Sequence, residues 1–440
     1  MGRPTPEAAL SPGTLRRLLS RGLVRAGLVT YLFSGLTLVA NLVTGVVTAR
    51  ALGPDGRGVT VALLTVTQLA GFLCAVGVAQ SLSYFIARRP QDAPSLLTTW
   101  VLMLLPLTAL TIAITELLLP TIFATDGDQA ITIGRWFAFT IVLVVGIELN
   151  YGLLLGTYDF FVYNALRFAQ PMLTAGSFVV LWWLDALTVE SALIATSVAS
   201  AIVLVAGVSR AVKRIGVGPP APRLGLTSLW YGVRGQGSTV AANVTARLDV
   251  AMLPAFVAAA SVGLYSVATN ISLIVYQLSN TFAGLVLPAA ARDPRRGPLK
   301  VVGSLWASLA AAGLVAIGLA LFARPLLGFV YGDEFRDAAE PLLLLLPGAV
   351  LFAGSSILGA GLYAAGRPFT ATLPQLIGMA VTVVGLFVFL RVGGITAAAL
   401  VSTASYATVF LATLVAYKAV TGRPWRWFLP TPARVRALAR

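Results

Sequence analysis

The chain has 440 residues, of which 58% are hydrophobic and only 11% are charged. Soluble domains carry roughly 25% charged residues, so a soluble fold of this length would lack the polar side chains that cover a surface. The absence of histidine and the single cysteine exclude an intrachain disulfide, a cysteine metal site and a Ser-His-Asp triad. Composition therefore indicates a membrane protein.

Twelve apolar runs are long enough to cross a bilayer core of about 30 Å as helices. They occupy residues 28–49, 59–86, 98–119, 135–156, 165–184, 191–208, 233–257, 263–290, 300–322, 341–364, 370–390 and 395–417. None of them alternates polar and apolar residues as a membrane β-strand does. The sequence therefore predicts an all-α integral membrane protein with about twelve transmembrane helices.

The net charge of +15 is distributed unevenly between the predicted loops. With the N-terminus inside, 23 of the 31 Lys and Arg residues fall in inner segments, 6 in outer segments and 2 in the seventh helix. This asymmetry predicts that both termini are cytoplasmic, and it explains most of the basic charge without a nucleic-acid partner. The preference for Arg over Lys is typical of a GC-rich bacterial genome, so the expected location is the bacterial cytoplasmic (inner) membrane.

The chain divides into two similar halves. Residues 58–62, which open the second predicted helix, match residues 263–268, which open the eighth, at an offset of about 205 residues. Six helices per half give a parallel repeat, an architecture in which transporters place the substrate site between two lobes. The predicted units are a basic N-terminal segment (1–27), a first lobe (28–208), a cytoplasmic linker (209–232), a second lobe (233–417) and a basic tail (418–440). Within the linker, residues 224–231 predict a short interfacial helix.

Four sequence motifs carry a family resemblance. Residues 49–58, Ala-Arg-Ala-Leu-Gly-Pro-Asp-Gly-Arg-Gly, resemble the AR-x-LGP-x-x-x-G loop of polysaccharide flippases. Three further segments resemble other signatures of the same group: residues 247–249 with 262–266, residues 331–335 and residues 361–368. Across residues 25–420 the chain is therefore similar to the oligosaccharide flippase branch of the multidrug/oligosaccharidyl-lipid/polysaccharide exporter superfamily.

The resemblance implies two six-helix lobes in a V around a central cavity, working by alternating access. The implied cargo is a polyprenyl-diphosphate-linked oligosaccharide, moved from the cytoplasmic to the outer leaflet for cell-surface polysaccharide biosynthesis. No covalent chemistry is implied, so the protein is not expected to be an enzyme. The expected partners are the lipid-linked oligosaccharide, membrane lipids and polysaccharide-assembly proteins.

Two alternative functions stay open. A cation-coupled exporter of small drugs, from the same superfamily, should place an acidic residue in the cavity of the first lobe. A membrane glycan polymerase or ligase would need a large outer catalytic loop, whereas the longest predicted outer loop, residues 323–340, is short.

Polar side chains inside a membrane are costly, so their positions in the predicted helices suggest function. The polar residues of the first and seventh helices recur at steps of three and four, which places them on one face of each helix. The candidate substrate-binding residues are Asn41 in the first helix, Gln236, Asn243 and Arg247 in the seventh, and Asn270 and Gln277 in the eighth. The alternative is ordinary interhelical hydrogen bonding, for which Ser, Thr and Asn are common.

Arg247 is the preferred ligand for a diphosphate, because a guanidinium stays charged and can hold phosphate with two hydrogen bonds. The alternative is a structural ion pair with Asp249 or Glu148. Asp249 and Glu148 are candidates either for coupling transport to H⁺ or Na⁺ or for an ion pair with Arg247. The ion pair is the preferred interpretation of these two acids. Arg234 either contacts the incoming headgroup or is an ordinary interfacial arginine. No cofactor or metal site is expected.

Overall fold

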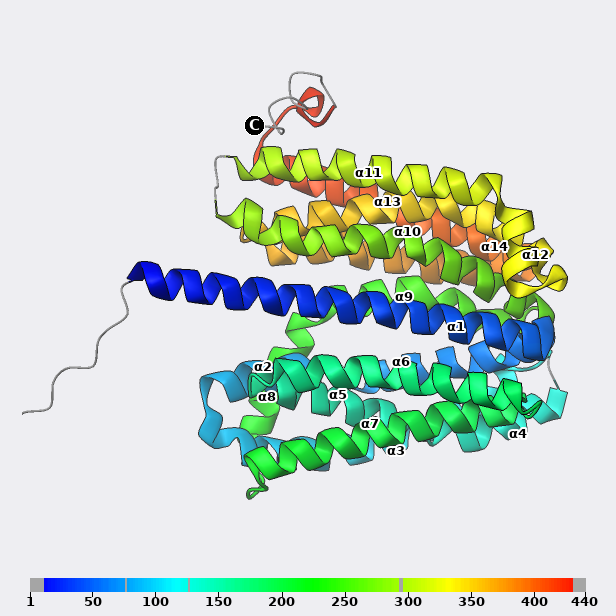
Figure 1. Ribbon diagram of the computed structural model, residues 1–440, viewed down its shortest axis with the longest axis horizontal. Helices are drawn as coiled ribbons and strands as arrows, with labels where there is room; N and C mark the ends of the chain where they lie inside the picture. Colours follow the sequence, from blue (N-terminus) through cyan, green and yellow to red (C-terminus); the bar gives the residue numbers. More distant parts are fainter. Residues whose placement is uncertain (1–11, 76, 126, 293–295, 430–440) are drawn as a thin grey trace, which may run out of the picture.

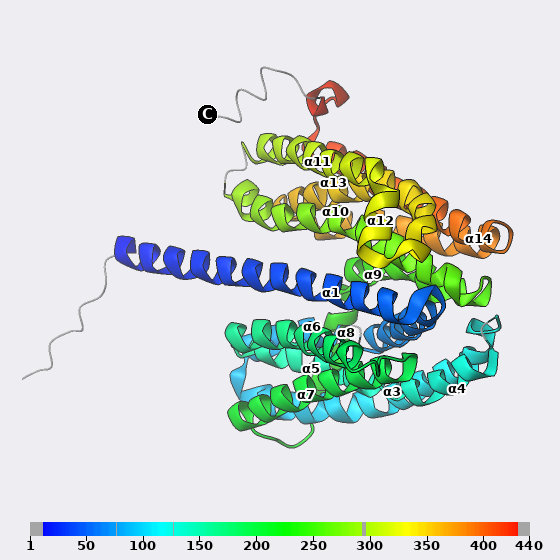
Figure 2. The same ribbon diagram turned by 45° about the vertical axis from the view of Figure 1, so that its right-hand side comes forward.

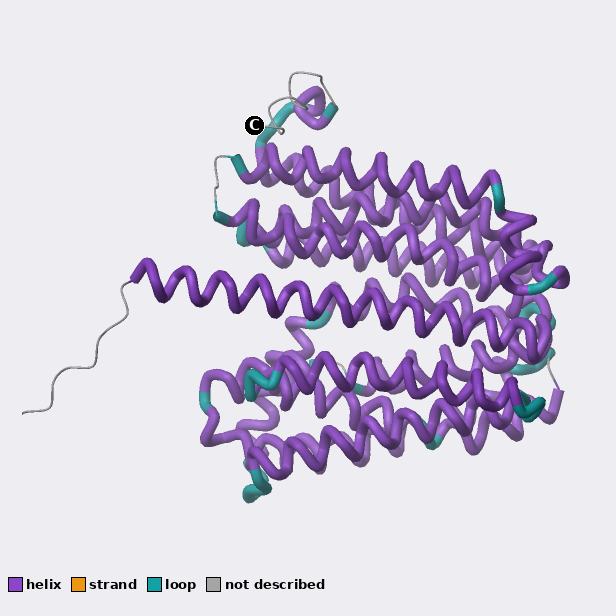
Figure 3. The backbone as a smooth tube through the Cα atoms, viewed as in Figure 1, coloured by secondary structure: helices purple, strands orange, loops and turns teal. Residues whose placement is uncertain are grey.

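The computed structural model of the chain describes residues 12–75, 77–125, 127–292 and 296–429. Parts of the two predicted terminal segments, residues 1–27 and 418–440, therefore lie outside the described residues. Over the described part the chain forms fourteen α-helices and four short 3-10 helices, with no strand. Figure 3 shows this helical content along the described backbone.

The helices of the first half and the linker follow one another with short connections. They are α1 (Pro12–Cys74), α2 (Val78–Arg88), η1 (Pro90–Asp92), α3 (Ala93–Ile122), α4 (Gly127–Ala138), α5 (Ile141–Gly156), α6 (Phe160–Trp183), α7 (Val189–Ile215) and α8 (Pro222–Gly235). The second half has the same helical character. Its elements are α9 (Gly237–Met252), η2 (Leu253–Ala255), α10 (Ala259–Ala291), α11 (Gly297–Leu321), α12 (Ala323–Tyr331), η3 (Asp333–Ala338), α13 (Ala339–Ala364), α14 (Pro368–Thr421) and η4 (Trp425–Phe428).

The described residues contain eight helical stretches that are long and apolar enough to cross a membrane. Two of them, Gly35–Arg88 and Pro368–Thr421, have 54 residues each. A straight helix of that length would span about 80 Å, far more than one bilayer core. Each turns back at a glycine with positive φ, Gly53 (64°) and Gly394 (50°), a conformation that side chains with a Cβ rarely adopt. The two bent stretches count as two passes each, and α6 and α9 add one pass each to the eight stretches. The described part of the chain therefore makes twelve passes, which confirms the sequence prediction.

The passes form two groups with α1 between them. Figures 1 and 2 show α10, α11, α13 and α14 on one side of α1 and α2 to α7 on the other. In this article, "outer end" means the end of the bundle that holds the two glycine bends, and "inner end" means the opposite end, where α7 ends and α13 ends. The names follow the orientation predicted from the loop charges.

The two ends of the bundle differ in how the groups pack. At the outer end one apolar core contains residues of both groups, including Leu63 and Phe137 from the first and Tyr265 and Phe335 from the second. Toward the inner end each group has a core of its own, built on residues 75–211 in one case and 283–428 in the other. The two lobes are therefore joined at the outer end.

The outer contact between the lobes follows the internal repeat. A Cβ added at Gly58 would overlap the carbonyl group of Ala259, and one added at Gly263 would overlap that of Pro54. At the repeat offset of 205 residues, Pro54 corresponds to Ala259 and Gly58 corresponds to Gly263. The two contacts are therefore equivalent positions of the internal repeat. The second and eighth passes therefore cross closely about a pseudo-two-fold axis, which supports the repeat detected in the sequence.

The linker and the seventh helix differ from the prediction. The seventh pass was expected at residues 233–257, but the chain breaks at Gln236 and α9 begins at Gly237. The predicted interfacial helix, residues 224–231, lies within the longer helix α8, which packs on α2 and α3. Trp100 Nε1 donates a hydrogen bond of 3.1 Å to Ser228 Oγ in α8. The linker is thus attached to the first lobe.

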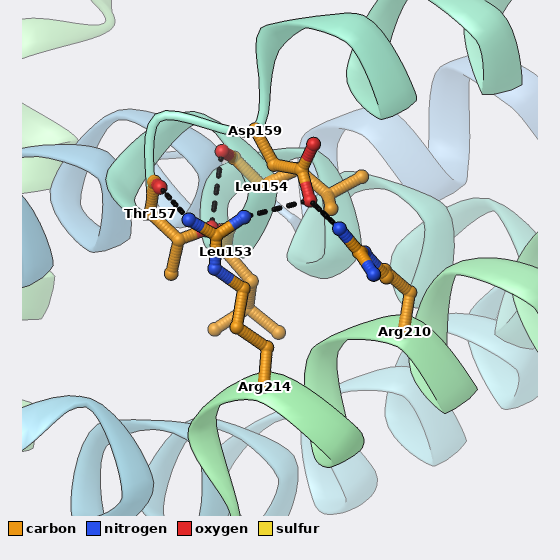
Figure 4. A network of polar contacts seen from close by, with 6 residues as sticks. All are labelled: Leu153, Leu154, Thr157, Asp159, Arg210 and Arg214. Atoms are coloured by element: carbon orange, nitrogen blue, oxygen red, sulfur yellow. Dashed lines mark hydrogen bonds and ion pairs between the residues drawn. The ribbon is translucent and has the colours of Figure 1, made fainter.

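An ionic cluster fixes the inner end of the first lobe (Figure 4). The carboxylate of Asp159, just before α6, accepts hydrogen bonds from Arg210 Nε at 3.0 Å and Arg214 Nη1 at 2.8 Å, both in α7. Arg214 Nη2 also donates to the carbonyl oxygen of Thr157 at 3.0 Å. These contacts hold the turn between α5 and α6 against the last turns of α7.

Candidate functional site

A cavity of about 340 Å³ lies between the two lobes, and we call it the central cavity. Its walls come mainly from α1, α9 and α10, with Phe178 of α6 and Tyr331 of α12. Four of the candidate substrate-binding residues line it: Asn41, Arg247, Asn270 and Gln277. The structure therefore brings together residues that are more than 200 positions apart in the sequence.

The polar face predicted for the first helix lines the central cavity. Asn41, Thr44, Gly45 and Thr48 all belong to its wall. The hydroxyl groups of Thr44 and Thr48 donate to carbonyl oxygens four residues earlier, at 2.9 and 2.8 Å. Because these hydroxyl groups are satisfied inside the helix, Asn41 is the residue of this face best placed to bind a ligand.

Arg247 stands where the central cavity meets a second cavity of about 270 Å³. We call this second space the N-lobe cavity, because α1, α4, α5, α6 and α7 form most of its wall. Arg247 Nη1 donates a hydrogen bond of 3.3 Å to Gln68 Oε1 of the first lobe. Among the described residues no carboxylate lies within 4.0 Å of its guanidinium.

Asp249 points away from Arg247, into the second lobe. Its carboxylate is completely buried and accepts hydrogen bonds from Tyr265 Oη at 2.5 Å, Ser402 Oγ at 2.9 Å and the backbone N–H of Val250 at 2.7 Å. The ion pair that was preferred for Asp249 and Arg247 is therefore wrong. Residues two apart on a regular helix project in nearly opposite directions, which is the physical reason.

Glu148 lies on the wall of the N-lobe cavity, together with Asn243 and Arg247. No ion pair within 4.0 Å joins Glu148 to Arg247 in the described part of the chain, so the second proposed pair is not formed either. Asn243 Nδ2 donates to the carbonyl oxygen of Thr239 at 2.9 Å, inside its own helix. Asn243 thus reaches the N-lobe cavity and not the central one.

Two candidate residues lie away from both cavities. Gln236 is buried at the break between α8 and α9, and its side-chain oxygen has no hydrogen-bond partner among the described residues. Arg234 belongs to the exposed face of α8, and its guanidinium lies 5.6 Å from the centre of the Trp230 ring. It borders a separate groove at the inner end with Tyr84 and Tyr231. Whether Arg234 contacts an incoming headgroup or is an ordinary interfacial arginine stays a prediction.

A second arginine of the central cavity, Arg57, was not among the residues predicted from the sequence. It was assigned to an outer loop, but the helix resumes directly after Gly53, and Arg57 is only 1% exposed on the cavity wall. Its Nε donates to Ser266 Oγ at 3.1 Å, and its Nη1 donates to Thr48 Oγ1 at 3.0 Å and to the carbonyl oxygen of Gly45. The only signal in the sequence is its position two residues before a predicted helix, within the error of such a boundary.

Comparison with known proteins gives the family. Residues 23–293, more than half of the chain, match the model of the family described as "Polysaccharide biosynthesis protein". A curated relative is the "Probable low-salt glycan biosynthesis flippase Agl15" of Haloferax volcanii, 22% identical over 165 residues, or 36% of this chain. The match spans only 35% of that relative's length.

Solved structures agree on the fold. The "Lipid II flippase MurJ, inward closed conformation" has a TM-score of 0.76 at 13% identity and covers 91% of this chain and 89% of its own. An inward-facing "multidrug resistance MATE family transporter of the MOP superfamily" has a TM-score of 0.67 at 15% identity, covering 94% of this chain and 99% of its own. The transporter VcmN of Vibrio cholerae follows at 0.57, with 12% identity and 92% and 99% coverage. The chain is a multi-pass membrane protein and belongs to the polysaccharide biosynthesis protein family.

Proposed function

We propose that the protein is a flippase that carries a polyprenyl-diphosphate-linked oligosaccharide from the cytoplasmic to the outer leaflet by alternating access. It acts in the bacterial cytoplasmic membrane, with both termini in the cytoplasm and no covalent chemistry. The family match and the partial similarity to a glycan flippase support this proposal. The similarity of fold to a lipid II flippase agrees with it.

The observation that carries the proposal is the cationic side of the central cavity. Inside the membrane, Arg247 reaches this cavity and donates to the side-chain amide of Gln68, and no carboxylate lies within 4.0 Å of it among the described residues. A charge in this position is costly unless a ligand compensates it. A diphosphate supplies the opposite charge and the planar oxygen pairs that a guanidinium binds best.

The remaining polar groups of the central cavity suit the sugar part of the cargo. Asn41 and Asn270 are exposed on opposite walls, and Gln277 lies near the inner end of the α10 wall. Amide side chains can both donate to and accept from sugar hydroxyl groups. We assign Arg247 to the diphosphate and these three amides to the first sugars. Membrane lipids and polysaccharide-assembly proteins stay expected partners.

Asp249 is our candidate for coupling to an ion gradient. It is a carboxylate buried in the second lobe among two hydroxyl groups, those of Tyr265 and Ser402. These three oxygens suit either a bound proton or a Na⁺ ion, which prefers oxygen ligands. Because Tyr265 lies in α10 and Ser402 in α14, binding there would change how α9 packs inside the second lobe.

Export of small cationic drugs is the second candidate function, and Glu148 favours it. This acid lines the N-lobe cavity, as a binding site for a cation would require. The residues that line the central cavity include Arg57 and Arg247 but neither Asp nor Glu. A cationic drug would be repelled there, so we rank the flippase first.

The experiment is transport in proteoliposomes, with a short-chain polyprenyl-diphosphate oligosaccharide and a sugar probe that reads one leaflet. Wild-type protein should move the lipid across the bilayer, and Arg234→Ala should retain this activity because Arg234 faces neither cavity. Movement of a cationic drug without movement of the lipid would favour the exporter instead.

A further inference from the structure

Arg57 is a buried cation that the proposed function does not yet use. It is 1% exposed, yet no carboxylate lies within 4.0 Å of it in the described part of the chain. Its neighbours are neutral oxygens of Gly45, Thr48 and Ser266, and the ring of Tyr331 lies 5.6 Å away. Hydrogen bonds and a cation–π contact reduce the cost of burying a charge but do not neutralise it.

The position of Arg57 in the central cavity differs from that of Arg247. Both residues line this cavity. Arg57 precedes Gln68, the partner of Arg247, by eleven residues on the same helix. At 1.5 Å per residue the backbone of Arg57 lies about 16 Å nearer the outer end than that of Gln68, roughly half the thickness of a bilayer core. The cavity therefore has one cationic group near its middle and another at its outer end.

The contacts of Arg57 belong to both lobes. Gly45 and Thr48 lie in α1 of the first lobe, whereas Ser266 lies in α10 and Tyr331 in α12 of the second. Alternating access requires the outer ends of the lobes to part. That movement separates Arg57 from Ser266 and Tyr331 but leaves its contacts with Gly45 and Thr48 in place. The guanidinium then faces the opening with Nε free to bind an oxygen of a ligand.

We propose that Arg57 is a second anion-binding residue, which takes the diphosphate of the cargo at the outer end of the cavity as the lobes part. This inference rests on the proposed function and adds a second binding position for the diphosphate. A ligand shifts a conformational equilibrium only through its different affinity for the two states. Cargo that binds Arg57 only after Ser266 has moved away favours the outward-open state, so opening is linked to the presence of an anionic headgroup.

The test compares two lipids that carry the same glycan, one linked through a diphosphate and one through a monophosphate. Each is assayed in proteoliposomes with wild type, Arg57→Gln and Arg57→Lys. Losing a hydrogen bond to a charged group should lower the ratio of diphosphate to monophosphate transport by about tenfold or more in Arg57→Gln. Arg57→Lys should lower the ratio less, because lysine keeps the charge but not the paired donors.

Arg50→Gln is the matched control. Arg50 also joins the lobes at the outer end, where its Nε donates to the carbonyl oxygen of Val330 at 3.0 Å, but it does not line the central cavity. Its replacement should leave the ratio unchanged. If Arg57→Gln does not fold, Arg57→Lys decides the question by the same ratio.

Three results would overturn the inference. Equal loss of both lipids in Arg57→Gln would mean that Arg57 is only an interlobe contact, and an unchanged ratio in both variants would mean that it binds no phosphate. In either case the proposed flippase function stands, because wild-type protein transports the diphosphate lipid. If wild-type protein transports neither lipid, the result contradicts both the proposed function and the inference.

Discussion

The two ends of the helix bundle are built in different ways. At the outer end the lobes share one apolar core and cross at Gly58 and Gly263, where backbone meets backbone. At the inner end each lobe has its own core, and the first lobe is held by ion pairs between the buried Asp159 and two half-exposed arginines. Contact between the lobes at the outer end therefore depends on close packing. The contacts at the inner end stabilise each lobe separately and do not join the two.

The largest effect is expected where the outer crossing is broken. In Gly58→Ala the new methyl group overlaps the carbonyl of Ala259, so the lobes cannot close at the outer end. We expect transport to fall about 100-fold, the cost of overpacking a tight contact. Lipid transport is measured in proteoliposomes with Asn41 unchanged. Closure of the outer end is measured separately, by labelling Asn41→Cys from the outside in a Cys74→Ser background.

Gly313→Ala is the control for this prediction, since a Cβ added there meets nothing within 4 Å. It should transport normally and keep Asn41→Cys protected from the outside reagent. The outer crossing would lose its importance if Gly58→Ala behaved like Gly313→Ala in both assays.

A smaller effect is expected inside the second lobe. Asp249→Asn keeps the shape of the side chain and its neighbours Tyr265 and Ser402 but cannot ionise. Stimulation of transport by an imposed pH or Na⁺ gradient should fall about tenfold, the effect of losing one charged interaction. Equilibration of the lipid without a gradient should continue.

Glu148→Gln separates the two candidate coupling residues. It removes the acid of the N-lobe cavity and leaves Asp249 intact. Gradient stimulation that survives in Asp249→Asn but disappears in Glu148→Gln would move coupling to the first lobe and strengthen the drug-exporter alternative.

The smallest effect is expected at the inner end. Arg210→Gln removes one of the two arginines that contact Asp159, while Arg214 remains. Both arginines are about half exposed, so the unfolding free energy should change by less than about 1 kcal/mol. Thermal unfolding followed by gel filtration checks this, and a large loss of stability would show that the inner end depends on its ion pairs.

Much of the fold could be predicted from the sequence because membrane helices are specified by length and hydropathy. All twelve passes were predicted, and the match between residues 58–62 and 263–268 predicted a repeat but not that these two segments cross at the outer end. The break at Gln236 was missed although Gly235 and Gly237 flank it, because glycine is also frequent inside membrane helices. It depends on α8 packing against the first lobe through Ser228, which is a tertiary contact.

The candidate site was predicted where polar residues lie well inside an apolar helix, as Asn41, Arg247, Asn270 and Gln277 do. Arg57 was missed because charge beside a helix boundary is ordinarily solvated. Only the bend at Gly53, which returns the chain to the cavity, shows that it is buried. The partners of Asp249 could not be predicted, because Tyr265 and Ser402 approach it from two other helices of the second lobe.

The central claim is that the cationic side of the central cavity binds the headgroup of an anionic lipid. The most direct test is transport of the diphosphate-linked oligosaccharide by Arg247→Ala, compared with wild type and Arg234→Ala in the same proteoliposomes. We predict that Arg247→Ala lowers transport about 100-fold, as expected for losing a hydrogen-bonded contact to a charged headgroup, while Arg234→Ala stays active. Fully active Arg247→Ala protein would contradict the account.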